Sequence, residues 1–131
     1  MQSNLSISNS FNQKLASFSR FKETNLFSPI IIIESGDVAF FHSNVEGHQC
    51  NMRSGSSLRV EHYSRVYINN VLLYGDVVGD KSLFYTTDFS SFHNTGVFNE
   101  VEIRANKTIS LGGDVTIKKT TLNSEKIFLN D

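Results

Sequence analysis

Ile30-Ile31-Ile32-Ile33 is the most apolar run in the chain, and it directly follows Pro29, the only proline. The run continues into Glu34-Ser35-Gly36-Asp37-Val38. An unbroken apolar run indicates a strand that is buried on both faces. The Gly-Asp pair is typical of a turn, because glycine adopts positive φ and aspartate bonds to its own backbone. We therefore predict a core strand over 30–34, a turn over 35–37 and a new strand from Val38.

The Gly-Asp-Val ending occurs twice more, at Gly75-Asp76-Val77 and at Gly113-Asp114-Val115. The three copies lie 39 and then 38 residues apart, and an apolar-biased segment precedes each of them. A near-constant period is typical of stacked units, and this one fits two turns of a β-solenoid of about 17–20 residues each. The alternative is that a common turn sequence recurs here by chance.

The rest of the chain after residue 28 consists of short apolar or alternating segments between turns. Val97 to Ile103 alternates cleanly between apolar and polar positions, and no helical period follows Glu23. We count about twelve candidate strands of this kind. Such frequent turns predict an all-β fold, either a β-solenoid or, as the alternative, a β-sandwich or jelly roll.

The first 27 residues have a different pattern. Phe11, Leu15, Phe18 and Phe21 are spaced as on one face of a helix, and Ser10 can cap its start. We therefore predict a short amphipathic helix over 11–23, in an N-terminal segment (1–27) that precedes a single β domain (28–131). The Phe face can pack on that domain or contact a partner or membrane. A basic, Ser-rich start is also typical of targeting signals, which is the third interpretation.

The bulk composition excludes several classes of protein. A net charge of −1 argues against broad electrostatic capture of nucleic acid. No apolar run approaches the length of about 18–20 residues that spans a bilayer, and the N-terminus lacks the apolar region of a Sec signal. We expect no transmembrane segment, and a protein that is cytoplasmic or exported without a cleaved Sec signal. The single cysteine, Cys50, rules out a disulfide within the chain.

Four residues are the candidates for metal binding: His42, His48, Cys50 and His62. Imidazole and thiolate are zinc ligands, but their spacing matches no zinc template. A nucleophilic Cys50 would need a base beside it, and no motif supplies one. We therefore expect no metal, no cofactor and no catalytic residue, and we expect that the protein is not an enzyme.

Three tyrosines are the candidates for a ligand surface: Tyr63, Tyr67 and Tyr74. Aromatic side chains with nearby amides are the ingredients of a carbohydrate-binding surface, since each ring has an apolar body and a polar tip. The alternative is ordinary packing at strand ends. Carbohydrate binding by a lectin-like domain, on a secreted bacterial or phage protein, is the second function that the sequence indicates.

Residues 30–131 resemble the bactofilins, bacterial β-solenoid cytoskeletal proteins. Tyr74-Gly75-Asp76-Val77 and Gly112-Gly113-Asp114-Val115, set among Val/Ile strands, are similar to the short Gly-Asp-Val/Ile steps of that family. The resemblance implies a stacked β domain that self-associates end to end, with an N-terminal tail that contacts a membrane or partner. Our leading expectation is thus a non-enzymatic structural module that forms homo-oligomers or binds other proteins.

Overall fold

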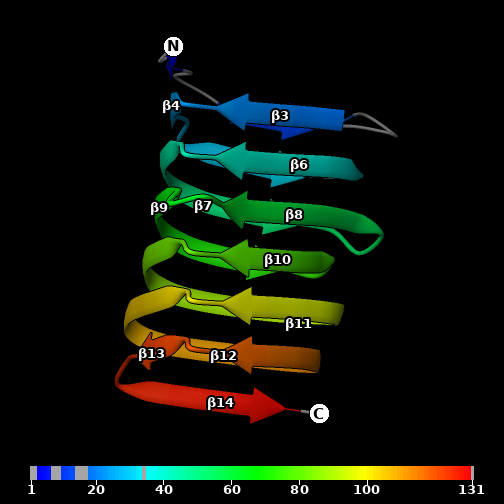
Figure 1. Cartoon of the computed structure of the whole chain (residues 1–131), viewed down its shortest axis with the longest axis vertical. Coiled ribbons are helices and arrows are strands. Elements are labelled where there is room, and N and C mark those ends of the chain that lie inside the picture. The colour runs from blue at the N-terminus through cyan, green and yellow to red at the C-terminus, as the bar shows by residue number, and fades with distance from the viewer. Residues whose placement is uncertain (1–2, 7–9, 14–17, 34, 131) are drawn as a thin grey trace.

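The computed structural model describes residues 3–6, 10–13, 18–33 and 35–130. The chain winds into a β-solenoid of about six turns, and the described residues contain no helix (Figure 1). The predictions of an all-β fold and of a solenoid are confirmed, and the sandwich alternative is not adopted.

The strands fall into a single 14-stranded sheet in which every pairing is parallel. They are β1 (Ser3–Ser6), β2 (Ser10–Gln13), β3 (Phe18–Lys22), β4 (Thr24–Phe27), β5 (Ile30–Ile33), β6 (Gly36–Phe41), β7 (Asn44–Met52), β8 (Ser56–Glu61), β9 (Arg65–Leu73), β10 (Asp76–Asp80), β11 (Leu83–Asn99), β12 (Glu102–Lys118), β13 (Thr121–Asn123) and β14 (Lys126–Asn130).

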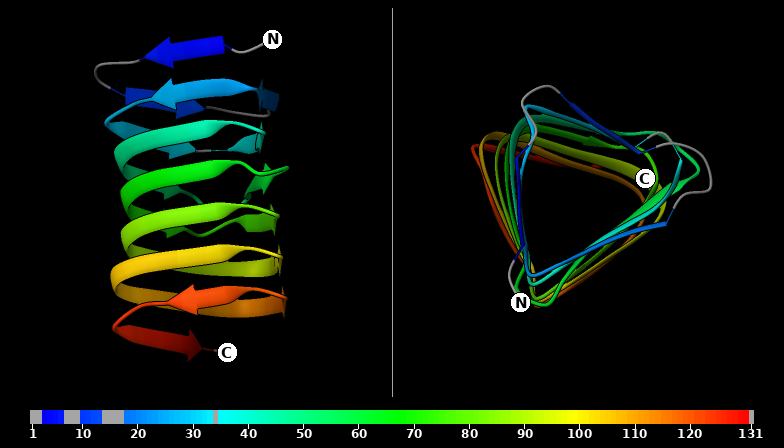
Figure 2. Two further views of the ribbon diagram at one scale, coloured as in Figure 1. Left: turned by 60° about the vertical axis from the view of Figure 1, so that its left-hand side comes forward. Right: turned by 90° about the horizontal axis from the view of Figure 1, so that it is seen from above.

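Seen from above, the solenoid is a triangular tube with three flat faces (Figure 2). Face 1 contains β3, β6, β8, β10, the end of β11 and the end of β12. Face 2 contains β1, β4, the starts of β7, β9, β11 and β12, and β13. Face 3 contains β2, β5, the ends of β7 and β9, the middle of β11 and β12, and β14. The longest strands therefore bend around corners and serve two or three faces.

The register explains the Gly-Asp-Val repeat. Paired residues are 18 to 21 positions apart, which is the length of one turn. Val38 pairs with Leu58, Leu58 with Val77, Val77 with Gly96 and Gly96 with Val115. The three copies therefore occupy one corner at intervals of two turns, which confirms the predicted period.

The glycines of the three copies have different tasks at this corner. Gly36 and Gly113 adopt positive φ angles of 92° and 83°, a conformation that glycine reaches without steric cost. At Gly75 the constraint is space, because an added Cβ would lie 2.1 Å from the carbonyl oxygen of Ser56. A shared sequence thus satisfies two separate requirements of the stack.

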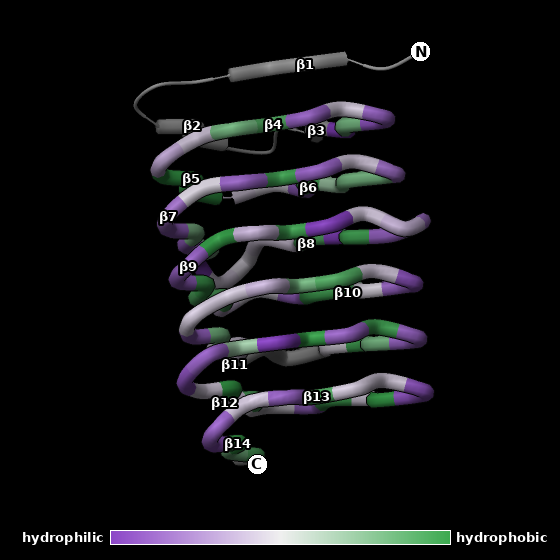
Figure 3. Tube along the Cα trace, turned by 90° about the vertical axis from the view of Figure 1, so that its left-hand side faces the viewer, coloured by the Kyte–Doolittle hydropathy of each residue, from purple (hydrophilic) through white to green (hydrophobic). Residues whose placement is uncertain are grey.

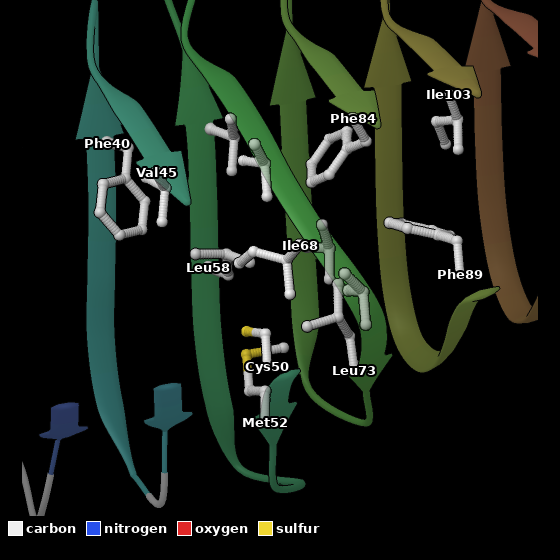
Figure 4. Packing of buried hydrophobic residues seen from close by; sticks show 14 of the residues in the cluster. Phe40, Val45, Cys50, Met52, Leu58, Ile68, Leu73, Phe84, Phe89 and Ile103 are labelled. Carbon is white, nitrogen blue, oxygen red and sulfur yellow. The ribbon is translucent and has the colours of Figure 1, made fainter. Parts of the chain in front are cut away.

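Each wall of the tube is one sheet thick, so alternate side chains point inward and outward. Hydrophobic and hydrophilic residues accordingly alternate along much of the chain (Figure 3). The inward rows are mainly apolar, with buried Thr86 and Ser91 as exceptions, and they form one continuous core in which Cys50, Met52, Ile68 and Leu73 lie together (Figure 4). The prediction that residues 30–33 are buried on both faces is wrong. Ile31 and Ile33 are 2% and 1% exposed, but Ile30 on the outer side is 39% exposed.

The helix predicted over 11–23 is not found in the part of this segment that the structure describes. Ser10–Gln13 and Phe18–Lys22 are the strands β2 and β3, while Leu15 lies outside the described residues. Phe11 pairs with Ile31 and Phe18 with Asp37. Phe18 and Phe21 lie three positions apart in the single strand β3, so this spacing does not mark a helix face.

Phe21, the last of these four residues, packs on the solenoid. Its ring stacks on that of Phe40, with 5.0 Å between centroids and 16° between the planes. The strands before residue 28 pair in parallel with later ones, such as β4 with β7. A domain boundary at residue 28 stays a prediction, as does a membrane or partner contact through Phe11, Leu15, Phe18 and Phe21.

Every non-glycine residue with positive φ in the described chain lies where face 1 turns into face 2. These residues are Glu23, His42, His62, Tyr63, Lys81, Glu100 and Lys119. A left-handed conformation costs a non-glycine residue about 1–2 kcal/mol. The residue that follows is Thr24, Ser43, Ser64, Ser82, Val101 or Thr120, a hydroxyl residue in all turns but one. We call this column the hydroxyl corner.

Ser43 illustrates how the hydroxyl groups stabilise this corner. Its Oγ donates to the carbonyl oxygen of Phe41 at 2.9 Å, across the left-handed residue between them. The same Oγ accepts from the N–H of Thr24, one turn earlier, at 3.1 Å. The N–H of Ser43 donates in turn to Oγ of Ser64 at 3.1 Å. The Ser43 hydroxyl therefore stabilises the bend of its own turn and also bonds that turn to its neighbour.

Substituting Ser43→Ala tests this interaction. The change leaves the buried Thr24 N–H without its acceptor, and we expect it to lower the free energy of unfolding by about 1–3 kcal/mol. Urea titration followed by circular dichroism measures this. The control is Ser110→Ala in β12, on the outer row of face 3, where we expect a change within about 0.5 kcal/mol. Equal effects at the two serines would contradict the importance of the corner.

Candidate functional site

The last turn of the solenoid exposes apolar side chains that earlier turns bury. Ile117, Ile127 and Leu129 are 38%, 42% and 66% exposed. Their register partners in the preceding turn, Phe98, Ile109 and Leu111, are 0%, 0% and 1% exposed. Inward rows of the core thus continue to this end of the tube and are not covered there by any described residue. With the half-buried Val115 and Leu122, we call these residues the open end.

The backbone of the open end has a second property. β13 and β14 each pair only with β12 among the described strands, and residues 114–118 of β12 pair only with β11. One edge of each of these segments is therefore free. A free strand edge presents N–H and C=O groups that can pair with another strand. The free strand edges face along the tube axis, and the exposed apolar side chains of the open end lie beside them.

The opposite end of the described core is covered. Leu26 and Ile31 are each 2% exposed, and Ile33 is 1% exposed. Their strands, β4 and β5, pair with β1 and β2, the first strands of the chain. Leu26, Ile31 and Ile33, in the turn next to the first described strands, are therefore covered, whereas inward apolar residues of the last described turn are in contact with solvent.

A hollow on the surface follows the hydroxyl corner over four turns and has a volume of about 440 Å³. One rim carries the left-handed residues Tyr63, Lys81, Glu100 and Lys119. The other rim carries the first outward residues of face 2, Arg65, Leu83, Glu102 and Thr121. The small residues between the rims, such as Ser64 and Ser82, point inward and leave a depression. We call it the corner trough.

The structure places the three candidate tyrosines at separate locations. Tyr63 lies on the corner trough and is 68% exposed. Tyr67 lies on face 2, where its ring stacks on Tyr85 at 5.5 Å between centroids. Tyr74 follows β9 at the corner between faces 3 and 1. They do not form one surface, and ligand binding by any of them stays a prediction.

The four candidate metal ligands are also dispersed. His42 and His62 lie at the hydroxyl corner in neighbouring turns, and the His62 ring contacts Phe41 at 5.7 Å between centroids. His48 lies in β7, next to the corner between faces 2 and 3, and Cys50 points into the core. Within the described ranges, no three His, Cys, Asp or Glu side chains are grouped so that they could hold a metal ion.

Cys50 is a core residue. It borders a void of about 20 Å³ whose lining is entirely apolar and includes Ile31 and Val71. Burial raises the pKa of its thiol from the ordinary 9.0 to about 12. The thiolate, which is the reactive form, is therefore suppressed at neutral pH.

We predict that Cys50 reacts with a thiol reagent only after unfolding. At pH 8 the folded protein should label far more slowly than the protein in urea, which should label stoichiometrically. Because the unfolded thiol ionises near 9 and the folded thiol near 12, the unfolded state loses its proton first, and stability should fall as the pH rises above 9. Rapid labelling of the folded protein would contradict the burial of this side chain.

Sequence reasoning missed the open end and the corner trough. The signal for both is the sequence pattern of the hydroxyl corner, in which a polar residue, then Ser or Thr, one further residue and an apolar residue recur in every turn but the one with Val101. Lys22-Glu23-Thr24-Asn25-Leu26 and Lys118-Lys119-Thr120-Thr121-Leu122 are its first and last copies. Aligning the chain on this pattern identifies the outward residues of each turn and the inward residues of the last one.

No protein-family model, curated protein or solved structure matches this chain. The resemblance to the bactofilins therefore stays a prediction that rests on the Gly-Asp-Val steps. Among the described residues, none belongs to a helix with the length and apolarity needed to cross a membrane.

Proposed function

We propose that this protein is a non-enzymatic structural module that self-associates through its open end. The observation that carries the proposal is the abrupt change in exposure between the last two turns, from 1% at Leu111 to 66% at Leu129. Exposed apolar clusters beside a free strand edge mark interaction sites in soluble proteins.

A second copy of the chain is the partner that fits this end. The last turn has the same three faces as the turns before it, with its apolar rows continuous with theirs. A surface of this kind is complementary to another solenoid turn of like size, which continues the hydrogen bonding of the sheet and covers the interior. Repeat proteins whose terminal units lack a polar cap associate or aggregate for this reason.

The free energy gained by burying the open end is close to the cost of association, so we expect the assembled fraction to rise with protein concentration. Burying one Ile or Leu completely contributes about 1.5–3 kcal/mol, and the open end exposes about half of each side chain. Association costs about 4–15 kcal/mol in lost translational and rotational freedom. Apolar contact alone therefore offsets only part of the cost, and pairing of the free strand edges supplies the rest.

Substituting Ile127→Lys tests the proposal. Ile127 lies on the inward row of β14, and a charge there would be buried without a partner in the assembly. Sedimentation velocity should show larger species of the unaltered protein as its concentration rises. The variant should sediment as a monomer over the same range and keep the circular dichroism spectrum of the unaltered protein.

The matched control is Phe128→Lys, at the neighbouring residue on the opposite side of the same strand. Phe128 pairs with Ser110 on the outer row and is 47% exposed, so this change adds the same charge outside the tube. We expect it to leave association unchanged. A monomeric unaltered protein at the highest concentration, or an Ile127→Lys variant that still assembles, would overturn the proposal.

A further inference from the structure

The corner trough has the shape of a site for an extended ligand. Its rims are two outward columns that run along the tube axis, and its volume of about 440 Å³ is within the range of about 300–1,000 Å³ that is usual for ligand sites. Successive turns of a sheet are about 4.8 Å apart, so the rim offers one pair of side chains at each such step. A linear polymer whose units have a similar length can contact each turn in the same way.

The charges of the trough favour an acidic ligand. Arg65, Lys81 and Lys119 line it, against Glu100 and Glu102. Glu102 forms an ion pair with Arg104, with 3.1 Å between its Oε1 and the Arg104 Nε, so part of its charge is balanced outside the trough. The remaining lining is net positive.

The uncharged groups of the trough favour a sugar. Tyr63 lies at one end with 68% of its surface exposed, and its ring offers an apolar face for the C–H groups of a pyranose. The Glu100 carboxylate accepts hydrogen bonds from hydroxyl groups, and the hydroxyl of Thr121 donates and accepts. A chain of carboxylate-bearing sugars combines the hydroxyl groups, apolar ring faces and negative charges that these side chains match.

We propose that the corner trough binds a linear acidic oligosaccharide along the tube axis, with a sugar ring on Tyr63 and its carboxylates beside Lys81 and Lys119. The trough lies on the side of the solenoid and shares no residue with the open end. Saccharide binding and self-association are therefore independent, and the Ile127→Lys variant should keep full saccharide affinity.

Isothermal titration calorimetry with an oligogalacturonate tests this inference. The full chain should bind it, and should bind a neutral linear xylo-oligosaccharide of equal length at least about tenfold more weakly. Poly-L-glutamate, which has the charges but no sugar rings, should also bind at least about tenfold more weakly. Tyr63→Ala should weaken oligogalacturonate binding by about tenfold or more, as removal of an aromatic anchor does. Lys81→Gln should weaken it and make it less dependent on salt.

The matched control is Tyr74→Ala, which removes another exposed tyrosine at a different corner and should leave affinity unchanged. Absence of oligogalacturonate binding would overturn the inference. Equal affinity for poly-L-glutamate would overturn it as well, since charge alone would then explain binding. Equal losses in the Tyr63→Ala and Tyr74→Ala variants would do the same.

Discussion

The rest of the structure depends on the hydroxyl corner, where a non-glycine residue adopts a left-handed conformation in every turn. That conformation costs about 1–2 kcal/mol each time, and a hydrogen bond contributes about 0.5–1.5 kcal/mol. One hydroxyl offsets the cost because it bonds twice, as Ser43 does with Phe41 and Thr24. Since these bonds join neighbouring turns, they also set the register in which the strands pair. Side-chain bonds between neighbouring turns elsewhere, such as Asn44 to Asn25 and Thr108 to Asp88, support the same register.

The outer and inner surfaces of the tube follow from this register. Because the wall is one sheet thick, a fixed register places apolar side chains in continuous inward rows and leaves outward columns in line along the axis. The inward rows stay apolar up to the last described turn. Ile127 and Leu129 are therefore exposed there, while their partners in the preceding turn, Ile109 and Leu111, are buried. The small residues of the hydroxyl corner point inward, so the outer surface between the two rims is depressed and forms the corner trough. A single geometric rule thus produces both candidate sites.

Sequence patterns gave the all-β class and the two-turn period, because Gly-Asp-Val recurs in one structural position. They failed wherever a strand turns a corner. Val97 to Ile103 reads as one alternating strand, yet Phe98 and Ile103, at opposite phases, are both buried because the alternation shifts at Glu100. The corner pattern identifies the inward residues of the last turn, but it does not give their exposure, since exposure of Leu129 depends on which turns stack on it.

Hydrogen–deuterium exchange measured at several protein concentrations tests whether copies of the protein meet at the open end. If the open end is the self-association surface, amides of β13 and β14 should exchange rapidly in dilute solution and become protected as the concentration rises. Amides of β8, which is paired on both sides, should exchange slowly at every concentration. Exchange of β13 and β14 that does not change with concentration, while larger species form, would show that the copies meet elsewhere and would contradict the account.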